Sequence, residues 1–452
     1  MTSTSESQQA LTEGSIIRGI LTFAFPIFLG QVLQQFYNMA DAWVIGNFAD
    51  NNAFAAVSSG GNLTFLIIGL FNGIAAGGGV VISRYYGAKD ISNLKAAIHT
   101  NFLFGLLASV AATALGLLLI PPMLRMMNTP ESVLPYSVQY FRIYFGGVST
   151  IVMYNMCMSI MRALGDSRHP LYYLIISSLI NVALDLLFVA VFQWGVAGAA
   201  VATVIAQGLS VSLCIVQMLR NPDITLRLDM RSLKWNGKLM GKVIRQGLPA
   251  GVQNAVISLG NVAIQTNINS FGPFAMSGQG AHAKIEGFAF LSVMSMSLTL
   301  PTFVSQNLGA GNTSRAKKGA LFGCIVGVGA AAATGIVIYI LSPQLIRLFV
   351  SAPEAVEYGT TTARIVTRFY ALLAFSHCAA GVLRGCGKST VPMVVMLSFW
   401  CVVRTVYVTL ILRFINEFRM IAWAYPLTWS LSSIVFAIYL IRLDWHRASE
   451  GL

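Results

Sequence analysis

Long apolar runs alternate with short polar segments along almost the whole chain, from about residue 16 to about residue 441. Most runs hold about 18 residues or more, which at about 1.5 Å per helical residue is enough to cross a hydrocarbon core about 30 Å thick. The pattern predicts twelve membrane-spanning α-helices, bounded by charged residues and by Pro or Gly breaks. The predicted spans are 16–40, 53–82, 95–120, 133–161, 170–192, 196–218, 241–268, 277–304, 318–341, 356–383, 392–415 and 420–441.

The composition fits a chain that lies almost wholly in a membrane. Hydrophobic residues make up 56% of the 452 residues and charged residues only 10%, whereas soluble chains carry about 25% charged residues. The net charge of +13 could indicate nucleic-acid binding, but the basic residues are spread over short loops rather than clustered on one face. The sequence shows no nucleophile with its base, no phosphate-binding loop and no metal-binding motif. We therefore expect no enzymatic activity, no cofactor and no nucleic-acid partner.

Positive charge is distributed unequally between the two sides of the predicted spans. Twenty Lys and Arg residues lie at the two termini and in the loops after spans 2, 4, 6, 8 and 10, against four in the opposite loops. By the positive-inside rule, both termini and the linker after span 6 are cytoplasmic. We expect a multi-pass protein of the cell inner membrane.

The second half of the chain repeats the first at a constant offset. Ser83-Arg-Tyr-Tyr-Gly-Ala-Lys-Asp90 aligns with Ser305-Gln-Asn-Leu-Gly-Ala-Gly-Asn312, and Arg162-Ala-Leu-Gly-Asp-Ser167 aligns with Arg384-Gly-Cys-Gly-Lys-Ser389. Six spans per copy make the copies parallel, an architecture whose binding site lies between the halves. We predict an amino-terminal tail (1–15), a first lobe (16–218), a linker (219–240), a second lobe (241–441) and a carboxyl-terminal tail (442–452).

These features together resemble the multidrug and toxic compound extrusion (MATE) family along essentially the whole chain. The resemblance rests on the six-plus-six spans, a proline in the first span of each half, the S-x-x-x-G-A loop after spans 2 and 8, and the R-x-x-G-x-S loop after spans 4 and 10. It implies two lobes about a central V-shaped cavity that opens to either side in turn. It also implies antiport, in which an amphipathic, cationic organic molecule leaves as H⁺ or Na⁺ enters. We expect small-molecule substrates, contact with membrane lipids and a monomer.

Ionisable side chains are rare within the predicted spans, and each costs about 3 kcal/mol at the centre of a span, so each indicates a functional site. Asp41 lies near the outer end of span 1. Gln34, Tyr37 and Asn38 precede it at i−7, i−4 and i−3, so we expect them to form a supporting polar face beside it. The alternative is that Asp41 is a solvated carboxylate at the periplasmic end of the helix.

Span 5 carries Asn181 and Asp185 at i and i+4, so both side chains point the same way. Span 6 begins near Val196, which puts Thr203 at a depth similar to that of Asp185, roughly 10 Å below the outer end. Asp41, Asn181, Asp185 and Thr203 therefore predict a cation-coupling site, which either holds Na⁺ or shares a proton between two acids. In the MATE resemblance they match the acid of span 1, the Asn-x-x-x-Asp of span 5 and the hydroxyl of span 6.

The second lobe does not repeat this acid cluster. In the register of the repeat Tyr407 stands opposite Asp185, and span 7 has no acid of the kind that some MATE members use, so coupling is predicted to be asymmetric. Glu286 in span 8 is left open between a substrate-facing or coupling acid and the partner of Arg404 in a buried ion pair. Lys284 is two residues away and does not share its helix face.

Pro26 removes one backbone hydrogen bond from span 1 about four turns before Asp41, so it predicts a hinge that bends or straightens as the cation binds. Flexible Met side chains adapt to varied ligands, and aromatic faces attract organic cations. On these grounds the candidate cavity residues are Phe36, Tyr154, Met158, Glu286 and Met294.

Two other functions stay open on the sequence. A lipid-linked oligosaccharide flippase of the same superfamily shares two parallel six-helix lobes, but such proteins usually add spans and line the cavity with basic residues, which are few in these spans. A channel or a non-transporting membrane protein is the third interpretation. The sustained repeat and the intramembrane acids argue against it.

Overall fold

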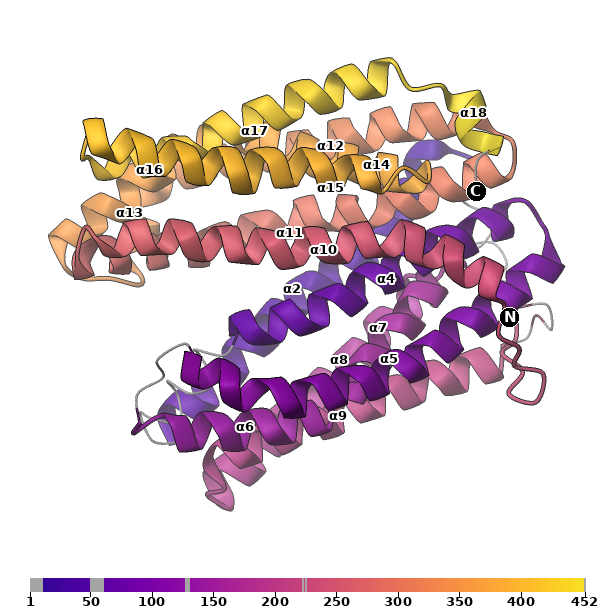
Figure 1. Ribbon diagram of the computed structural model, residues 1–452, viewed down its shortest axis with the longest axis horizontal. Helices are drawn as coiled ribbons and strands as arrows, with labels where there is room; N and C mark the ends of the chain where they lie inside the picture. The colour runs from indigo at the N-terminus through magenta and orange to yellow at the C-terminus, as the bar shows by residue number, and fades with distance from the viewer. Residues whose placement is uncertain (1–10, 49–60, 127–130, 222, 224–225, 451–452) are drawn as a thin grey trace. The chain divides into compact units, whose positions relative to one another are not determined.

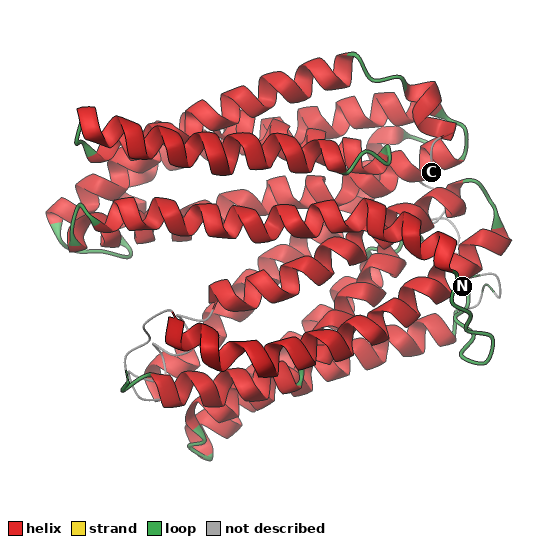
Figure 2. Ribbon diagram, viewed as in Figure 1, coloured by secondary structure: helices red, strands yellow, loops and turns green. Residues whose placement is uncertain are grey.

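The computed structural model describes residues 11–48, 61–126, 131–221, 223 and 226–450. All regular secondary structure in these residues is helical (Figure 2), as the apolar pattern predicts. Nine of the described helices are long and apolar enough to cross a membrane, and one bent pair makes a tenth span. The predicted all-helical, multi-pass fold is confirmed.

Predicted spans 1 to 6 correspond to the first described helices (Figure 1). The fourth span is bent by 47° where its two helices meet, and residues 53–60 of predicted span 2 lie outside the described residues. The helices are α2 (Ile16–Phe48), α4 (Gly61–Gly87), α5 (Ile91–Met126), α6 (Leu134–Gly146) with α7 (Val148–Ala163), α8 (Arg168–Asp185) with the π-helical turn η1 (Leu186–Val191), and α9 (Gly195–Leu219).

Spans 7 to 12 follow in the same order, so each of the twelve predicted spans corresponds to a described helix or run of helices; α4 and α10 are the two that are not among the ten counted above. Several helices extend past the predicted ends, because the hydropathy pattern marks only the part that lies in lipid. The helices are α10 (Gly237–Asn269), α11 (Pro273–Gly309), α12 (Thr313–Arg347), α13 (Pro353–Val366) with η2 (Thr367–Phe369) and α14 (Tyr370–Gly385), α15 (Thr390–Met396) with the π-helical turn η3 (Leu397–Val403) and α16 (Arg404–Phe414), α17 (Phe418–Ile441) and the short α18 (Trp445–Glu450).

The internal repeat is visible in the backbone as well as in the sequence. Gly165 and Gly387, which occupy equivalent places in the two repeats, adopt φ angles of 86° and 78° in the turns after α7 and α14. Lys89 and Gly311 are also equivalent in the repeat, and they adopt φ angles of 56° and 74° after α4 and α11. Such left-handed turns favour glycine. The equivalent loops of the two halves therefore fold alike even where one copy has a lysine.

Contacts divide the chain into two compact units, whose boundaries differ from the predicted lobes at two segments. Unit 1 contains residues 29–251, and unit 2 contains residues 11–28 and 252–450. The base of α2, residues 16–28, thus belongs to the second unit, and the base of α10, residues 237–251, belongs to the first. Each boundary falls two residues after a proline, Pro26 in α2 and Pro249 in α10.

The base of α2 is an integral part of unit 2. Its buried Ile20, with no exposed surface, joins the main apolar core of that unit. On α11, the Ser295 hydroxyl donates to the carbonyl oxygen of Ala24 at 2.9 Å. Nδ2 of Asn307 donates to the carbonyl oxygen of Leu11 at 2.8 Å, just before α2 begins. Unit 2 therefore holds the amino-terminal segment of α2 both near Ala24 and just before the helix begins.

The base of α10 is held in unit 1 by a glycine crossing with α4. Gly73 and Gly77 of α4 lie against Gly247 and Gly251 of α10, and each pair has the i, i+4 spacing. A Cβ added to Gly247 would overlap the Cα of Ile74 and lie 2.8 Å from the carbonyl oxygen of Gly73. Small residues at this spacing let two backbones touch within a membrane. This crossing joins the first helix of the second repeat to unit 1.

Candidate functional site

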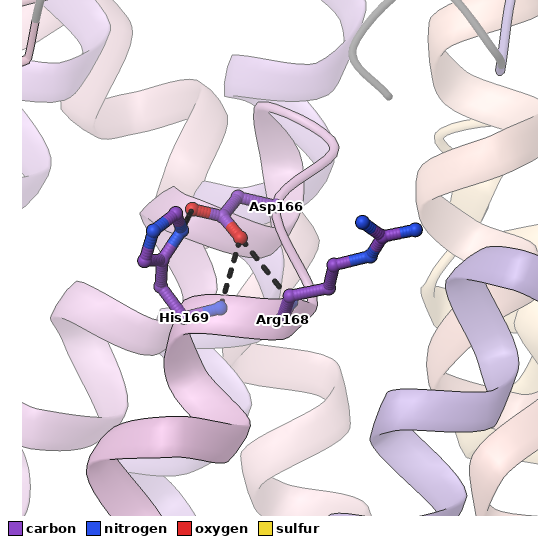
Figure 3. Close-up of polar contacts among 3 residues, drawn as sticks. All are labelled: Asp166, Arg168 and His169. Carbon is purple, nitrogen blue, oxygen red and sulfur yellow. Dashed lines mark hydrogen bonds and ion pairs between the residues drawn. The ribbon is translucent and has the colours of Figure 1, made fainter. Parts of the chain in front are cut away.

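The helix that carries Asn181 and Asp185 begins at a capped turn (Figure 3). One carboxylate oxygen of Asp166 accepts hydrogen bonds from the backbone N–H groups of Arg168 at 3.2 Å and His169 at 3.1 Å. Its other oxygen lies 2.7 Å from Nδ1 of His169. An acid at this place satisfies backbone donors that the first turn of a helix leaves open. The start of α8 is thereby fixed at its link to α7.

Asp185 is the last residue of α8 and is directly followed by the π-helical turn η1. Asp185 and Asn181, one turn earlier, are both completely buried. A π-helical turn inserts one extra residue into the helix, which rotates the preceding side chains by about 100° relative to the following ones. Such turns occur frequently at functional sites. The π-helical turn η1 therefore sets the direction of the Asp185 carboxyl relative to the side chains that follow it.

A small apolar cluster fixes the carboxyl-terminal part of α2 beside this acid. Val44 and Ile45 of α2 pack with Val189 of η1 and Ala199 of α9, and all four side chains are essentially inaccessible. Asp41 lies one helical turn before this contact, on the same helix. The three elements that carry the predicted site residues are thus held together by apolar packing next to the polar groups.

The structure brings the four predicted coupling residues into one cluster in unit 1. The carboxyl groups of Asp41 and Asp185 are in hydrogen-bonding contact. The amide of Asn181, oriented to satisfy both partners, donates to Oδ2 of Asp185 at 2.8 Å and accepts from the backbone N–H of Thr203 at 3.3 Å. Span 1, span 5 and span 6 therefore each contribute a polar group to the same place.

Tyr37 is the one residue of the predicted supporting polar face on α2 that contacts the cluster. The hydroxyls of Tyr37 and Thr203 are hydrogen-bonded, and Thr203 in turn donates to the carbonyl oxygen of Ala199 at 3.0 Å. Because the Thr203 hydroxyl donates to Ala199, it accepts the hydrogen bond from the Tyr37 hydroxyl. Gln34 and Asn38 bond instead to one another at 3.3 Å on the more exposed side of α2.

Two tyrosines that sequence reasoning missed lie next to the acids. Tyr140 and Tyr144 of α6 interact electrostatically with Asp41, and their rings stack with centroids 5.8 Å apart. Their i, i+4 spacing, which puts both hydroxyls on one face of α6, is the signal that could have found them. Because the two tyrosines are far from Asp41 along the chain, the sequence alone did not indicate that they lie beside this acid.

The acid pair offers free oxygen atoms to a ligand. Oδ1 of Asp41 and Oδ1 of Asp185 are buried and have no hydrogen-bond partner among the described residues. Two carboxyls in contact share one proton far more easily than they carry two negative charges. Carboxylate, amide and hydroxyl oxygens are also the ligands that hard cations prefer. The donor set therefore fits either a proton or a small hard cation.

The candidate cavity residues are divided between the two units. In unit 1, Phe36 is 54% exposed, Met158 is half-buried, and Tyr154 is buried with a hydroxyl that has no partner among the described residues. In unit 2, Glu286 and Met294 of α11 are half-buried. These five residues therefore differ widely in how accessible they are to a substrate.

Comparison with known proteins identifies the family. The family model described as MatE matches residues 26–187 and again residues 249–410, which together are well over half of the chain. The chain belongs to the MatE family. The two matches start at equivalent places in the internal repeat, at Pro26 and Pro249, each two residues before a unit boundary. The predicted resemblance is confirmed, and the protein is a membrane transporter rather than an enzyme.

Relatives of this MatE protein include proteins named for multidrug resistance and for the transport of FAD. A "Probable multidrug resistance protein YpnP" of Bacillus subtilis (strain 168) is 28% identical, over 86% of this chain and 87% of its own. A "FAD transporter" of Shewanella oneidensis is 26% identical over 70% of each chain. A solved structure of a "multidrug resistance MATE family transporter of the MOP superfamily" in an outward-facing conformation covers 98% of both chains, with a TM-score of 0.90 and 19% identity, which shows the shared fold.

Proposed function

We propose that this MatE protein is a secondary active exporter of amphipathic organic compounds, driven by entry of H⁺ or Na⁺ at the pair formed by Asp41 and Asp185. The observation that carries the proposal is the contact between these two carboxyls, each of which keeps one buried oxygen without a partner among the described residues. The multidrug resistance named for relatives supports the organic cargo.

The coupling step follows from electrostatics. Without a cation, two adjacent carboxylates repel one another in a setting from which water is largely excluded, and a bound H⁺ or Na⁺ removes that repulsion. The acids lie on α2 and α8, so occupancy changes how strongly these two helices attract one another. The base of α2 belongs to unit 2 and its outer part to unit 1, so this change acts on a helix that links both units. Pro26, two residues before the boundary, is the proposed hinge.

Efflux of a fluorescent organic cation from proteoliposomes tests this function, with a pH gradient and a Na⁺ gradient imposed separately. One of the two gradients should drive efflux against the substrate gradient, and the other should have no effect. Ser177→Ala is a matched control, because Ser177 is a buried polar residue one turn before Asn181 on α8, and within the described part of the chain its hydroxyl bonds only to its own helix, at Leu174. Flux that responds to neither gradient would contradict antiport and indicate a channel.

The proposed orientation places both termini on the cytoplasmic side of the inner membrane. It rests on the twenty Lys and Arg residues that face that side, against four on the other. Cysteine labelling of the tail after α17 with a membrane-impermeant reagent in whole cells tests it. No labelling is expected until the membrane is opened.

A second candidate is export of an anionic amphipathic compound. Arg162 and Arg384 occupy equivalent places at the ends of α7 and α14, and the Nε atom of each is buried without a partner among the described residues. A guanidinium with an open donor suits a phosphate or carboxylate, and one relative is named for FAD. The same proteoliposomes loaded with an anionic dye separate the two candidates.

A further inference from the structure

The linker between α9 and α10 carries more positive charge than any other loop between the predicted spans. From residue 220 to residue 245 there are seven basic residues and two acidic ones, whereas each of the other loops holds at most three basic residues. The positive-inside rule accounts for a bias of this sign, but the other basic loops satisfy it with fewer than half as many charges. The excess therefore indicates a further role for this linker.

The linker is attached to unit 1 at two places (Figure 1). Leu228 is 1% exposed, and its backbone N–H donates to the carbonyl oxygen of Met218 on α9 at 3.0 Å. Further along the chain, the backbone N–H of Asn236 donates to the hydroxyl of Thr100 on α5 at 3.2 Å. The linker is therefore held against α9 near one end and against α5 near the other.

This attachment leaves the basic side chains of residues 226–238 exposed. Leu226 and Leu228 are buried, whereas Arg227 between them is exposed. Asp229, the only acid of this segment, accepts a hydrogen bond from the backbone N–H of Arg231 at 2.9 Å, a contact typical of a turn. The exposed basic residues are Arg227, Arg231, Lys234 and Lys238. None of the four forms an ion pair within the described part of the chain.

A neighbouring lysine is used inside unit 1 instead. Nζ of Lys242 donates to the hydroxyl of Tyr85 on α4 at 2.9 Å and lies 5.5 Å from the centroid of the same ring. This contact helps to hold the base of α10 against α4. Lys242 thus contributes to the fold, whereas the four exposed basic residues are available to a partner outside the chain.

Two large apolar side chains are exposed on the same segment. Met230 is 49% exposed and Trp235 is 48% exposed. Trp235 lies just before α10 reaches its predicted apolar part at residue 241. Tryptophan is enriched where a chain meets the membrane–water interface, and basic residues beside apolar ones are typical of surfaces that lie on a membrane. We call the set the linker patch: Arg227, Met230, Arg231, Lys234, Trp235 and Lys238.

The partner that fits the linker patch is an anionic phospholipid surface. Lys238 is three residues before the predicted apolar part of α10, about 5 Å along the helix axis, which puts it at the level of the lipid head groups. Anionic lipids attract basic segments next to a membrane span, and each Lys or Arg near the surface strengthens the attachment about fivefold. A soluble polyanion would leave Trp235 and Met230 in water, whereas a lipid surface takes up both the charges and the apolar side chains.

We propose that the linker patch docks on anionic phospholipids, with its four basic side chains on the lipid phosphates and the Trp235 ring among the head groups. The inference goes beyond the proposed export, and it depends neither on the cargo nor on the coupling ion. The linker leads directly into the base of α10, which packs against α4 at the glycine crossing. Lipid bound at the patch therefore holds this base at the membrane surface.

Quenching of a fluorophore by spin-labelled lipid tests the docking. All six cysteines of the chain are buried, so Ser232→Cys, at an exposed position inside the patch, gives one reactive site for an environment-sensitive dye. The full-length protein is placed in nanodiscs of phosphatidylglycerol and phosphatidylcholine in equal amounts, and only one of the two lipids carries the spin label. Quenching should be stronger when phosphatidylglycerol carries it. Equal quenching by the two lipids, or none by either, overturns the proposal.

Two triple variants identify the charges that select the lipid. Arg231→Gln, Lys234→Gln and Lys238→Gln together weaken the attachment about a hundredfold, so the preference for phosphatidylglycerol should disappear. The control removes the same charge from exposed residues of the opposite loops, through Arg125→Gln, Arg347→Gln and Arg413→Gln, and should keep the preference.

Salt and the tryptophan give two further readouts in the same assay. Raising the ionic strength screens exposed charges, so it should reduce the preference of the parent protein. Trp235→Ala should reduce quenching by both lipids and leave the preference for phosphatidylglycerol in place. A preference that persists in the linker variant, or that is lost equally in the control, overturns the proposal. If the linker variant does not fold, the comparison of the two lipids on the parent protein still decides.

Discussion

The glycine crossing between α4 and α10 can be tested by adding a single methyl group. Gly247→Ala places a Cβ where it would overlap the Cα of Ile74 and lie 2.8 Å from the carbonyl oxygens of Gly73 and Ile74. Ordinary contacts of this kind measure 3.4–4 Å, so two backbones must separate by about 0.6 Å or more. Neither helix has a flexible side chain at this point that could move instead.

The expected cost follows from overpacking a close contact, which typically destabilises a protein by about 1–3 kcal/mol. For a unit of this size, each kcal/mol lowers the melting temperature by about 2–4 °C. Gly247→Ala should therefore lower the melting temperature by about 2–12 °C. Gly241→Ala is the matched control in the same helix, because nothing lies within 4 Å of a Cβ there. The control should be neutral, or stabilising by about 0.5–1 kcal/mol through higher helix propensity.

The assay is thermal unfolding of the purified proteins in one detergent, followed by fluorescence-detected size-exclusion chromatography. A loss of stability in Gly247→Ala together with an unchanged or raised value in Gly241→Ala supports the crossing. Equal melting temperatures for the two variants would refute the close approach of α4 and α10 and, with it, the assignment of the α10 base to unit 1.

Three further substitutions examine the supports of the site. Tyr37→Phe removes the hydrogen bond to Thr203 and should weaken cation binding by about 1 kcal/mol, about fivefold, in an equilibrium binding assay; unchanged affinity would exclude Tyr37 from the site. Asp166→Ala removes the cap of α8 and should lower stability by about 1 kcal/mol, seen as a lower melting temperature. Asp90→Ala should cost a similar amount at neutral pH, because Asp90 accepts two hydrogen bonds from Asn93 at the start of α5. These bonds hold the pKa of Asp90 below its usual value, so the advantage of the parent protein is present above about pH 4 and is lost as pH falls further; a difference that stays constant down to about pH 2 would contradict this.

The spans and the repeat could be predicted because they depend on local pattern alone. An apolar run of sufficient length must span the membrane, and equivalent loops such as those at Gly165 and Gly387 repeat at a fixed offset. The i, i+4 spacing of Asn181 and Asp185 likewise fixes a shared helix face, and the structure brings both residues together with Asp41 and Thr203.

Features that depend on packing between distant segments could not be predicted. The amino-terminal segment of α2 belongs to unit 2 and that of α10 to unit 1. The first assignment depends on contacts such as that of Ser295 with Ala24, two residues that are far apart in sequence. The approach of Tyr140 to Asp41 depends on how α6 packs, and the π-helical turns after Asp185 and before Arg404 leave no signal in hydropathy. In each case the apolar pattern defines the helix but not the neighbour that it meets.

The central claim, that cation entry at the Asp41–Asp185 pair drives export, is tested most directly by gradient-driven transport in proteoliposomes containing Asp185→Asn. The amide keeps the size of the side chain but can neither share a proton nor carry the negative charge that attracts Na⁺. The variant should still bind substrate and exchange it down its own gradient, yet show no response to an imposed pH or Na⁺ gradient. Undiminished gradient-driven export by Asp185→Asn would contradict the account.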